Sequence, residues 1–298
     1  MPIKSPRIVG ISQIVEHPSL TEIRTSLEAA LRKNLQNQVI IRYHNANGDL
    51  TLSRQIARQL LGEGAEVLVG ISTPSTQDLV ATKTELPIVF SAINDPVQAG
   101  FLSTMEKPEK NITGVVLKSP LREQVQLIQQ MVPGAKKIGM LYTAGESNSV
   151  SVAQEFKQEV LSLGLTPVTK TVVNSAGVYA GTQALLSQVD AILLPTDNTV
   201  ISAVGVVINL CRKQHKPLFA SDTYSVSQGA LAGLGIDHTL LGQQTAEIVL
   251  QLLTGKKPQE IPVRIPTGNQ LHINQKYAKE YGITILDPIL KQTKKFYP

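Results

Sequence analysis

Short apolar runs alternate with segments of helical periodicity along most of this chain. In the first part of the chain, predicted strands occupy residues 7–12, 39–43, 66–71, 87–90 and 112–117. Between them, apolar residues recur at helical spacing, as Leu52, Ile56 and Leu60 do. The runs are too uniformly apolar to alternate between two environments. This is typical of a parallel sheet that helices cover on both faces.

The same alternation starts again after residue 118. A second series of predicted strands occupies residues 137–142, 166–173, 191–194, 217–220 and 231–236. The two halves share this architecture but little residue-by-residue identity. We therefore predict an α/β protein made of two similar lobes, each a doubly wound parallel sheet.

Local signals predict where several helices begin. Ser19 and Glu22 have the spacing of a capping box. Thr73, which precedes Pro74, is expected to cap the next helix, with the proline at its first position. In the second half, one helix is expected to begin at Val150 and another to span Val200–Leu210.

The last elements are too few to form a third domain. They are a helix at residues 240–253, a strand at 261–265 and an Asn274-capped helix at 274–281. They should complete the two lobes, which requires three crossings between them. The predicted lobes are residues 1–117 with 237–265, and 118–236 with 266–298, with a hinge near Lys118, Ile236 and Pro266.

Composition narrows the class of protein. With 298 residues, 42% of them hydrophobic and 17% charged, the chain has the make-up of a soluble globular protein. The formal charge of +5 is scattered, so no nucleic-acid partner is expected. No apolar run approaches the ~18 residues of a membrane span. The first residues, 1–6, contain no signal peptide, so either the protein is cytosolic or a leader has been removed.

Motifs for catalysis or metal binding are not found. The segment Gly145–Ser149 resembles a nucleophile elbow but ends in Ser rather than Gly. The first strand leads to Ser12 and Gln13 rather than to a glycine-rich dinucleotide motif. The one cysteine, Cys211, and the five histidines show no metal-ligand spacing. We expect no enzymatic activity, no cofactor and no metal.

Five polar loops directly follow predicted strands and precede the next element of the chain. In an open α/β sheet, ligands bind at such loops, beyond the carboxyl ends of the strands. The loops are Ser72–Thr76, Ser91–Pro96, Gly145–Ser149, Pro195–Thr199 and Ala220–Thr223.

These loops also carry a resemblance to a known family. The chain resembles the two-lobed substrate-binding proteins of ABC importers, and within them the subfamily associated with tryptophan or tyrosine. The likeness runs from Ile8 to about Ile285. It is carried by Gly10–Pro18, Ser72–Pro74, Val89–Pro96, Asn111–Val115, Ile138–Tyr142, Glu146–Ser149, Leu194–Thr199, Phe219–Asp222 and Gly229–Asp237.

The resemblance implies a small amino-acid ligand, a partner permease, a monomer and a location outside the cytoplasm, the leader being absent from this chain. The ligand's carboxylate suits hydroxyls and backbone N–H groups at helix N-termini. Its ammonium suits an ionised carboxylate. Binding would close the lobes about the hinge. The expected binding residues are Gln13, Ser72, Thr73, Ser91, Asp95, Tyr142, Ser147, Asn148, Ser149, Thr196, Asp197, Asn198 and Asp222.

Several of these residues have a purely structural alternative. Asp95, Asp197 and Asn198 are also typical helix caps, as are Ser72 and Thr73. Aromatic residues for a ligand ring are Phe90, Tyr142, Tyr224 and the ring of His17, of which Phe90 is favoured as a core residue. An alternative function is the ligand-sensing domain of a cytosolic transcription regulator or receptor, which shares the two-lobed fold.

Overall fold

A computed structural model describes residues 6–105, 108 and 110–298. We predicted that residues 1–6 contain no signal peptide. Of these, all but Pro6 lie outside the described residues. The chain divides into two compact units: Met1–Lys118 with His238–Thr267, and Ser119–Asp237 with Gly268–Pro298. The chain passes from one unit to the other three times. The predicted lobe boundaries lie within two residues of these positions.

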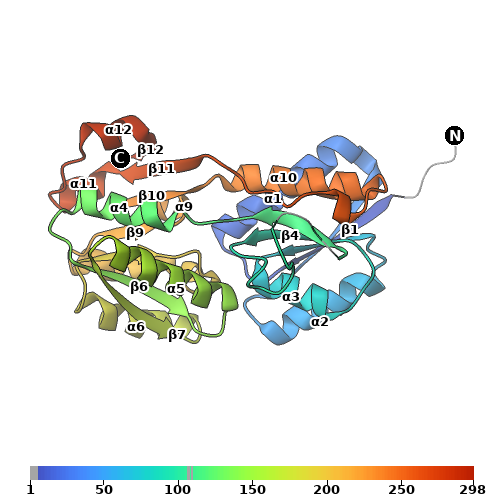
Figure 1. The fold of residues 1–298 in the computed structure, drawn as a ribbon, viewed down its shortest axis with the longest axis horizontal. Coiled ribbons are helices and arrows are strands. Elements are labelled where there is room, and N and C mark those ends of the chain that lie inside the picture. The colour runs from blue at the N-terminus through green and yellow to red at the C-terminus, as the bar shows by residue number, and fades with distance from the viewer. Residues whose placement is uncertain (1–5, 106–107, 109) are drawn as a thin grey trace. The chain divides into compact units, whose positions relative to one another are not determined.

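The first unit contains a parallel sheet, of which β1 and β4 are labelled in Figure 1. It has five strands in the order β2-β1-β3-β4-β5. Its long apolar strands are buried because helices pack on both faces. The strands are β1 (Arg7–Gln13), β2 (Val39–Asn45), β3 (Val67–Ile71), β4 (Ile88–Ile93) and β5 (Ile112–Val116).

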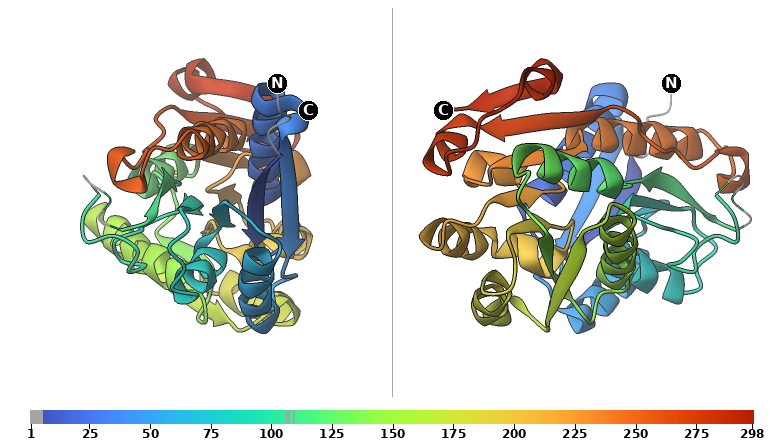
Figure 2. Two further views of the ribbon diagram at one scale, coloured as in Figure 1. Left: turned by 90° about the vertical axis from the view of Figure 1, so that its right-hand side faces the viewer. Right: turned by 60° about the vertical axis from the view of Figure 1, so that its left-hand side comes forward.

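Two pairs of helices cover this sheet. Helices α1 (Pro18–Leu35) and α10 (His238–Leu253) lie side by side, although more than 200 residues separate them in sequence (Figure 2). Helices α2 (Leu50–Gly62) and α3 (Thr73–Ala81) pack against each other and against β1 and β3. Short 3₁₀ turns occupy Gln36–Gln38 and Pro258–Glu260. The prediction that Phe90 is a core residue is confirmed, since it is fully buried.

The second unit contains a seven-stranded sheet with the order β12-β11-β10-β9-β8-β6-β7. All neighbours are parallel except β10 and β11, which are antiparallel. The strands are β6 (Lys137–Thr143), β7 (Thr166–Val172), β8 (Ala191–Leu194), β9 (Leu218–Ala220), β10 (Ala232–Ile236), β11 (Asn269–Asn274) and β12 (Thr293–Tyr297).

Two hydrophobic clusters lie on the two faces of this sheet. One gathers residues of α4 (Leu121–Met131) and α5 (Ser147–Ser162), and the other those of α6 (Val178–Leu186) and α8 (Val204–Lys213). The shorter helices are α7 (Asn198–Ser202), α9 (Tyr224–Gln228), α11 (Gln275–Glu280) and α12 (Asp287–Gln292), with a 3₁₀ turn at Ser175–Gly177. The predicted fold class, two doubly wound α/β lobes, is confirmed.

Several predicted helix starts are wrong. Helix α1 begins at Pro18 with His17 as its N-cap, so Ser19 is already helical and no capping box forms. Proline has no N–H to leave unpaired and its φ suits the first helical position. Thr73 is the first residue of α3 rather than its cap, which is Ser72. Helix α5 begins at Ser147, three residues before the predicted start.

Two other predicted elements differ from the structure. The expected helix Val200–Leu210 is interrupted at Ala203, which separates α7 from α8. Residues 261–265 do not form a strand, and Arg264 makes only an isolated bridge to Val115. Pro262 and Pro266 lack the N–H groups that a longer ladder would need.

Candidate functional site

Each sheet has a point where the loops that leave neighbouring strands diverge to opposite faces. In the first unit this switch point lies between β1 and β3, because β1 is flanked by β2 on one side and β3 on the other. Open α/β sheets bind ligands at such points. Gln13 pairs with Ile71, and Ile71 with Ser91, so the predicted residues Gln13, Ser72 and Ser91 lie at one edge of the sheet.

The backbone is strained at this edge, around the N-terminus of α3. Ser72, its N-cap, has φ of 78°, and Ala92, beyond the adjacent strand position Ser91, has φ of 59°. Non-glycine residues in this region cost of order 1–3 kcal/mol and occur often at binding sites. The N–H of Ser72 donates to the carbonyl of Ser91 at 2.9 Å. A Cβ at Gly70 would overlap Thr76, so glycine lets α3 sit close against β3.

Three buried polar atoms near this edge have no hydrogen-bond partner among the described residues. They are Ser12 Oγ, Gln13 Oε1 and Ser75 Oγ, and all three residues are fully buried. Gln13 donates from Nε2 to the carbonyl of Val15 at 2.8 Å. Buried polar groups are nearly always paired, so orphaned ones here indicate a place for a polar ligand or water. Ser75 lies in a predicted loop, but we did not expect it as a binding residue.

Two other predicted residues of this unit already have partners within it. The hydroxyl of Ser91 is 2.9 Å from that of Thr245 on α10. Asp95 is exposed, and its Oδ1 accepts from the N–H groups of Val97 and Gln98. Asp95 thus caps a turn at residues 96–100 rather than the helix that the structural alternative supposed.

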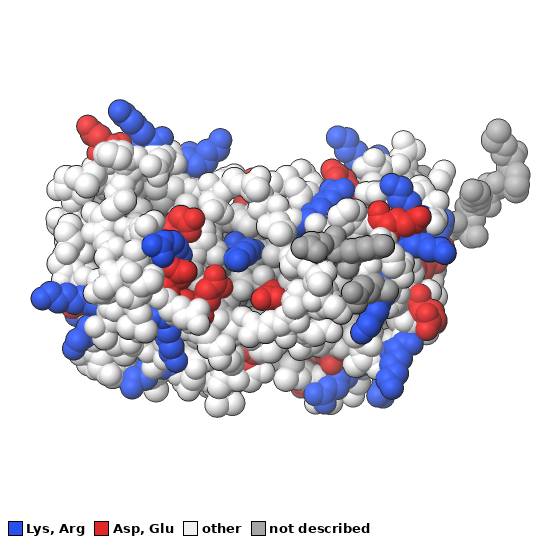
Figure 3. Space-filling model, viewed as in Figure 1, with Lys and Arg blue, Asp and Glu red and all other residues white. Residues whose placement is uncertain are grey.

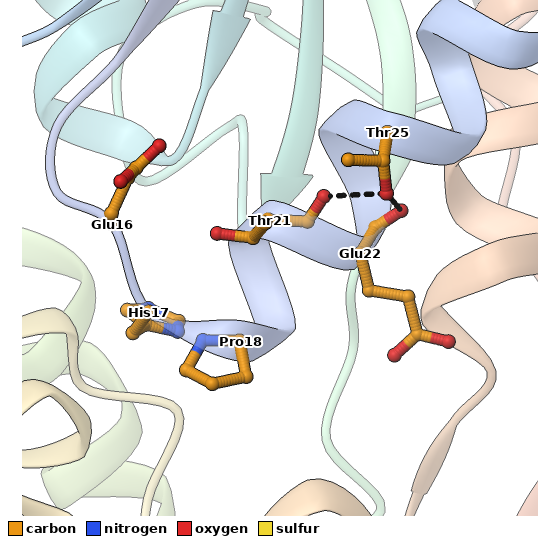
Figure 4. A pocket seen from close by; sticks show the side chains of 6 residues that line it. All are labelled: Glu16, His17, Pro18, Thr21, Glu22 and Thr25. Atoms are coloured by element: carbon orange, nitrogen blue, oxygen red, sulfur yellow. Dashed lines mark hydrogen bonds between the residues drawn. The ribbon is translucent and has the colours of Figure 1, made fainter.

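A pocket of about 470 Å³ lies at the N-terminus of α1, which follows β1 (Figure 4). Two carboxylates, Glu16 and Glu22, line it together with His17. Glu16 lies 3.7 Å from Arg24, whose guanidinium stacks over Tyr43 at 4.2 Å from the ring centroid. The other lining residues are Pro18, Thr21 and Thr25, and the Thr25 hydroxyl donates within the helix to Thr21 and Glu22.

The switch point of the second unit lies between β6 and β8. There Asp197, fully buried, connects the end of β6 to the start of α7. Its Oδ2 accepts from the N–H of Thr143 at 2.6 Å, and its Oδ1 accepts from the Thr143 hydroxyl and from the N–H of Val200, both at 2.8 Å. The capping alternative for Asp197 is thus confirmed, with Thr143 as an additional partner.

Glu146 lies beside this group and was missed by sequence reasoning. Its Oε2 accepts from Asn198 Nδ2 at 2.6 Å, and its Oε1 accepts from the Thr199 hydroxyl at 2.8 Å. Only 9% of the residue is exposed. Burial first, and then the negative charge of Asp197, raise the pKa of the Glu146 carboxyl. The one sequence signal was its place in the polar loop Gly145–Ser149.

Asp222 lies at the end of the next strand, β9, and is fully buried. Its Oδ1 accepts from the N–H of Ser225 and its Oδ2 from the Ser225 hydroxyl, both at 2.7 Å. Cβ atoms at Gly233 or Gly235 would overlap the backbone of Asp222 or Ser221, so β10 passes close to this loop. Asp222 is therefore held rigidly at the edge.

The remaining predicted residues of this unit are at the same end of the sheet. Ser147, Asn148 and Ser149 form the first turn of α5, where backbone N–H groups lack helical partners. Thr196 is half-buried in the loop after β8. Tyr142, on β6, packs against the hydrophobic cluster beneath α4 and α5. The structure thus brings the predicted residues of this unit together at one edge.

No group of three or more metal-binding side chains occurs among the residues that the structure describes. Within the same residues, no helix is long and apolar enough to cross a membrane. On the face drawn in Figure 3, Lys and Arg are interspersed with Asp and Glu rather than gathered into a stripe.

Two doubly wound α/β units, with polar loops at both switch points and three chain crossings, define a two-lobed binding protein. Residues 8–297 match the model of the ABC transporter substrate binding protein family. The chain belongs to this family.

Three relatives give the comparison more detail. The chain is 31% identical over 280 residues to a tyrosine-binding protein of Clostridioides difficile strain R20291, covering 93% of this chain and 81% of the relative. It is 35% identical to an ABC domain from Streptococcus pneumonia solved in complex with L-Trp, with a TM-score of 0.95, 98% of this chain and 100% of that chain being covered.

A third relative is a substrate binding protein with adhesive properties from Clostridium difficile, solved in a ligand-free, open structure. It is 29% identical, with a TM-score of 0.73, and 98% of this chain and 99% of that chain are covered. The predicted resemblance to the tryptophan and tyrosine subfamily is confirmed by these relatives.

Proposed function

We propose that this chain is the solute-binding component of an ABC importer, acts outside the cytoplasm as a monomer, and binds an aromatic amino acid, tryptophan or tyrosine. The observation that carries this proposal is the full-length likeness to the L-Trp complex, at 35% identity. The name of the tyrosine-binding relative supports the same ligand class. On this proposal the chain delivers its ligand to a partner permease and catalyses no reaction.

The ligand would meet different chemistry in each unit. In the first unit, the N-terminus of α3 offers backbone N–H groups, the dipole's positive end and the orphaned hydroxyl of Ser75 to a carboxylate. In the second unit, carboxylates at the ends of β6, β8 and β9 suit an ammonium group. A ligand that contacts both units favours a closed form, because only that form makes both sets of contacts.

A thermal-shift screen of the twenty amino acids tests the function. If L-Trp or L-Tyr binds with a Kd of about 1 μM, 1 mM ligand stabilises the protein by about 4 kcal/mol. We expect a clear rise in Tm with an aromatic amino acid and none with glycine or lysine. A screen in which a sugar or a basic amino acid gives the largest rise would reject the proposal.

Ser75→Ala tests the carboxylate site directly. The hydroxyl has no partner among the described residues, so its removal should leave the stability of the ligand-free protein unchanged. Losing a hydrogen bond to a charged ligand should weaken binding by about 1.5–3 kcal/mol. Ser53→Ala is a matched control, because Ser53 Oγ is equally buried and unpaired but lies on α2. Equal affinities for both variants, measured by titration calorimetry, would argue against this site.

A further inference from the structure

Two carboxylates are buried at the switch point of the second unit without a cationic partner nearby. Across the described residues, the ion pairs within 4.0 Å include neither Glu146 nor Asp197. Their partners are neutral side chains and backbone N–H groups. Charges that are buried in proteins are usually paired, so this site lacks a positive charge.

The two carboxylates differ in how far a ligand can reach them. An ionised carboxylate has about four acceptor positions. Asp197 uses three of them, for Thr143 and Val200. Glu146 likewise accepts from three side chains, Asn198, Thr199 and Asn148, but it retains 9% exposure while Asp197 has none. Glu146 is therefore the better placed of the pair to accept N–H donors from a ligand.

Asp222 accepts two hydrogen bonds from Ser225, but its surroundings are different. It is fully buried, it belongs to the β9 loop rather than to the β6–β8 switch point, and the close approach of β10 encloses its backbone. Glu146 also lies beside the charge of Asp197, which disfavours its ionised form. A ligand cation would relieve both this repulsion and the cost of burial.

Resting on the proposed function, we propose that Glu146 binds the ligand's α-ammonium group and so makes the site select amino acids over the matching desamino acids. The ammonium donates a hydrogen bond to the acceptor position of the carboxylate that its protein partners leave free. Asn198, Thr199 and Asn148 hold that carboxylate in place, and Asp197 adds negative charge nearby.

Glu146→Gln removes the negative charge while keeping the hydrogen bonds that hold the loop. The amide oxygen can accept from Asn198 Nδ2, and the amide nitrogen can donate to the Thr199 hydroxyl, which then reverses its role. The variant should fold with the loop in place. Its matched control is Glu159→Gln at the other end of α5, where the carboxylate faces Arg122. Asp222→Asn serves as the rival variant.

The experiment compares L-tryptophan with indole-3-propionate, and L-tyrosine with 3-(4-hydroxyphenyl)propionate, by titration calorimetry on each variant. Wild type and Glu159→Gln should bind the amino acid at least ~30-fold more tightly than its desamino analogue. In Glu146→Gln the preference should fall to about threefold or less, while the Kd of the analogue changes little. A role limited to holding the loop would weaken both ligands alike.

Two results would overturn the inference. One is a Glu146→Gln variant that keeps the full preference for the amino acid. The other is a preference that is lost in Asp222→Asn but kept in Glu146→Gln. In both cases wild type still binds an aromatic amino acid and the proposed function stands. A wild-type protein that binds neither tryptophan nor tyrosine would reject the proposed function, and the inference with it.

Discussion

Asp197→Asn should destabilise the second unit although the two side chains have the same shape. Asp197 receives its three hydrogen bonds on both oxygens: Thr143 N–H on Oδ2, and Val200 N–H with the Thr143 hydroxyl on Oδ1. An asparagine has one oxygen. Whichever way its amide is turned, an NH₂ group faces a backbone N–H, which leaves a buried donor unpaired.

The size of this effect follows from the cost of an unpaired buried group, about 1–3 kcal/mol. For a unit of this size that corresponds to a fall in Tm of roughly 2–12 °C. Removing one negative charge beside Glu146 offsets a part of the loss. Urea unfolding followed by far-ultraviolet circular dichroism measures the free energy of unfolding, and the chain contains no Trp to report by fluorescence.

Asp190→Asn is the matched control. The N–H groups of Lys136 and Lys137 both donate to the same oxygen of Asp190, each at 2.8 Å, so one amide oxygen can replace it. Burial alone would raise the pKa of Asp190, but these two backbone donors, together with the positive charges of Lys216 and Lys137, outweigh it and lower that pKa. Losing the charge should therefore cost less than about 1 kcal/mol. If Asp197→Asn proves as stable as Asp190→Asn, the reasoning from the distribution of donors is wrong.

Three further predictions concern stability and ligand binding. Because burial and Asp197 raise the folded-state pKa of Glu146 above its usual 4.5, its contribution to stability is greatest below that pH and is lost as pH rises through the folded value. The Tm of Glu146→Gln relative to wild type should thus rise from pH 4 to pH 8, and a pH-independent difference would contradict the shift. Gly114→Ala would place a Cβ against the Phe90 backbone and ring, so we expect a loss of about 1–3 kcal/mol. Gly134→Ala, which faces open space, should cost far less, and equal urea midpoints for the two would refute the close approach. Addition of L-Trp or L-Tyr should reduce the radius of gyration in small-angle X-ray scattering, whereas an unchanged radius under saturating ligand would exclude closure.

Local patterns were sufficient to locate most of the secondary structure. Runs such as Val67–Ile71 and Ala191–Leu194 are buried throughout, so their apolar composition reflects their environment directly. The polar loops could also be located from the local pattern, because a polar residue that follows a buried strand lies at the edge of a parallel sheet. Predicted helix starts were wrong where two neighbouring residues could each begin the helix. Pro18 is the first residue of α1, so Ser19 is not its cap.

The antiparallel pairing of β10 with β11 could not be predicted in this way. The 32 residues Asp237–Gly268 separate β10 from β11 in the sequence. Most of that segment belongs to the other unit. No local sequence pattern predicts which strand will pair with the edge of a sheet. Pairing direction depends on where the returning chain enters the unit, which is a property of the whole fold.

The amino-acid sequence by itself determined the two α/β units, the order of their elements and the loops that bear polar residues. Only the tertiary structure decided what those residues do. It showed that Asp197 is bound by Thr143, 54 residues away, and that Asn198 and Thr199 hold Glu146 across 52 and 53 residues. Hydrogen bonds and buried charges depend on distances of a few ångströms between side chains. Those distances are set by how strands pack, and spacing along the chain does not contain them.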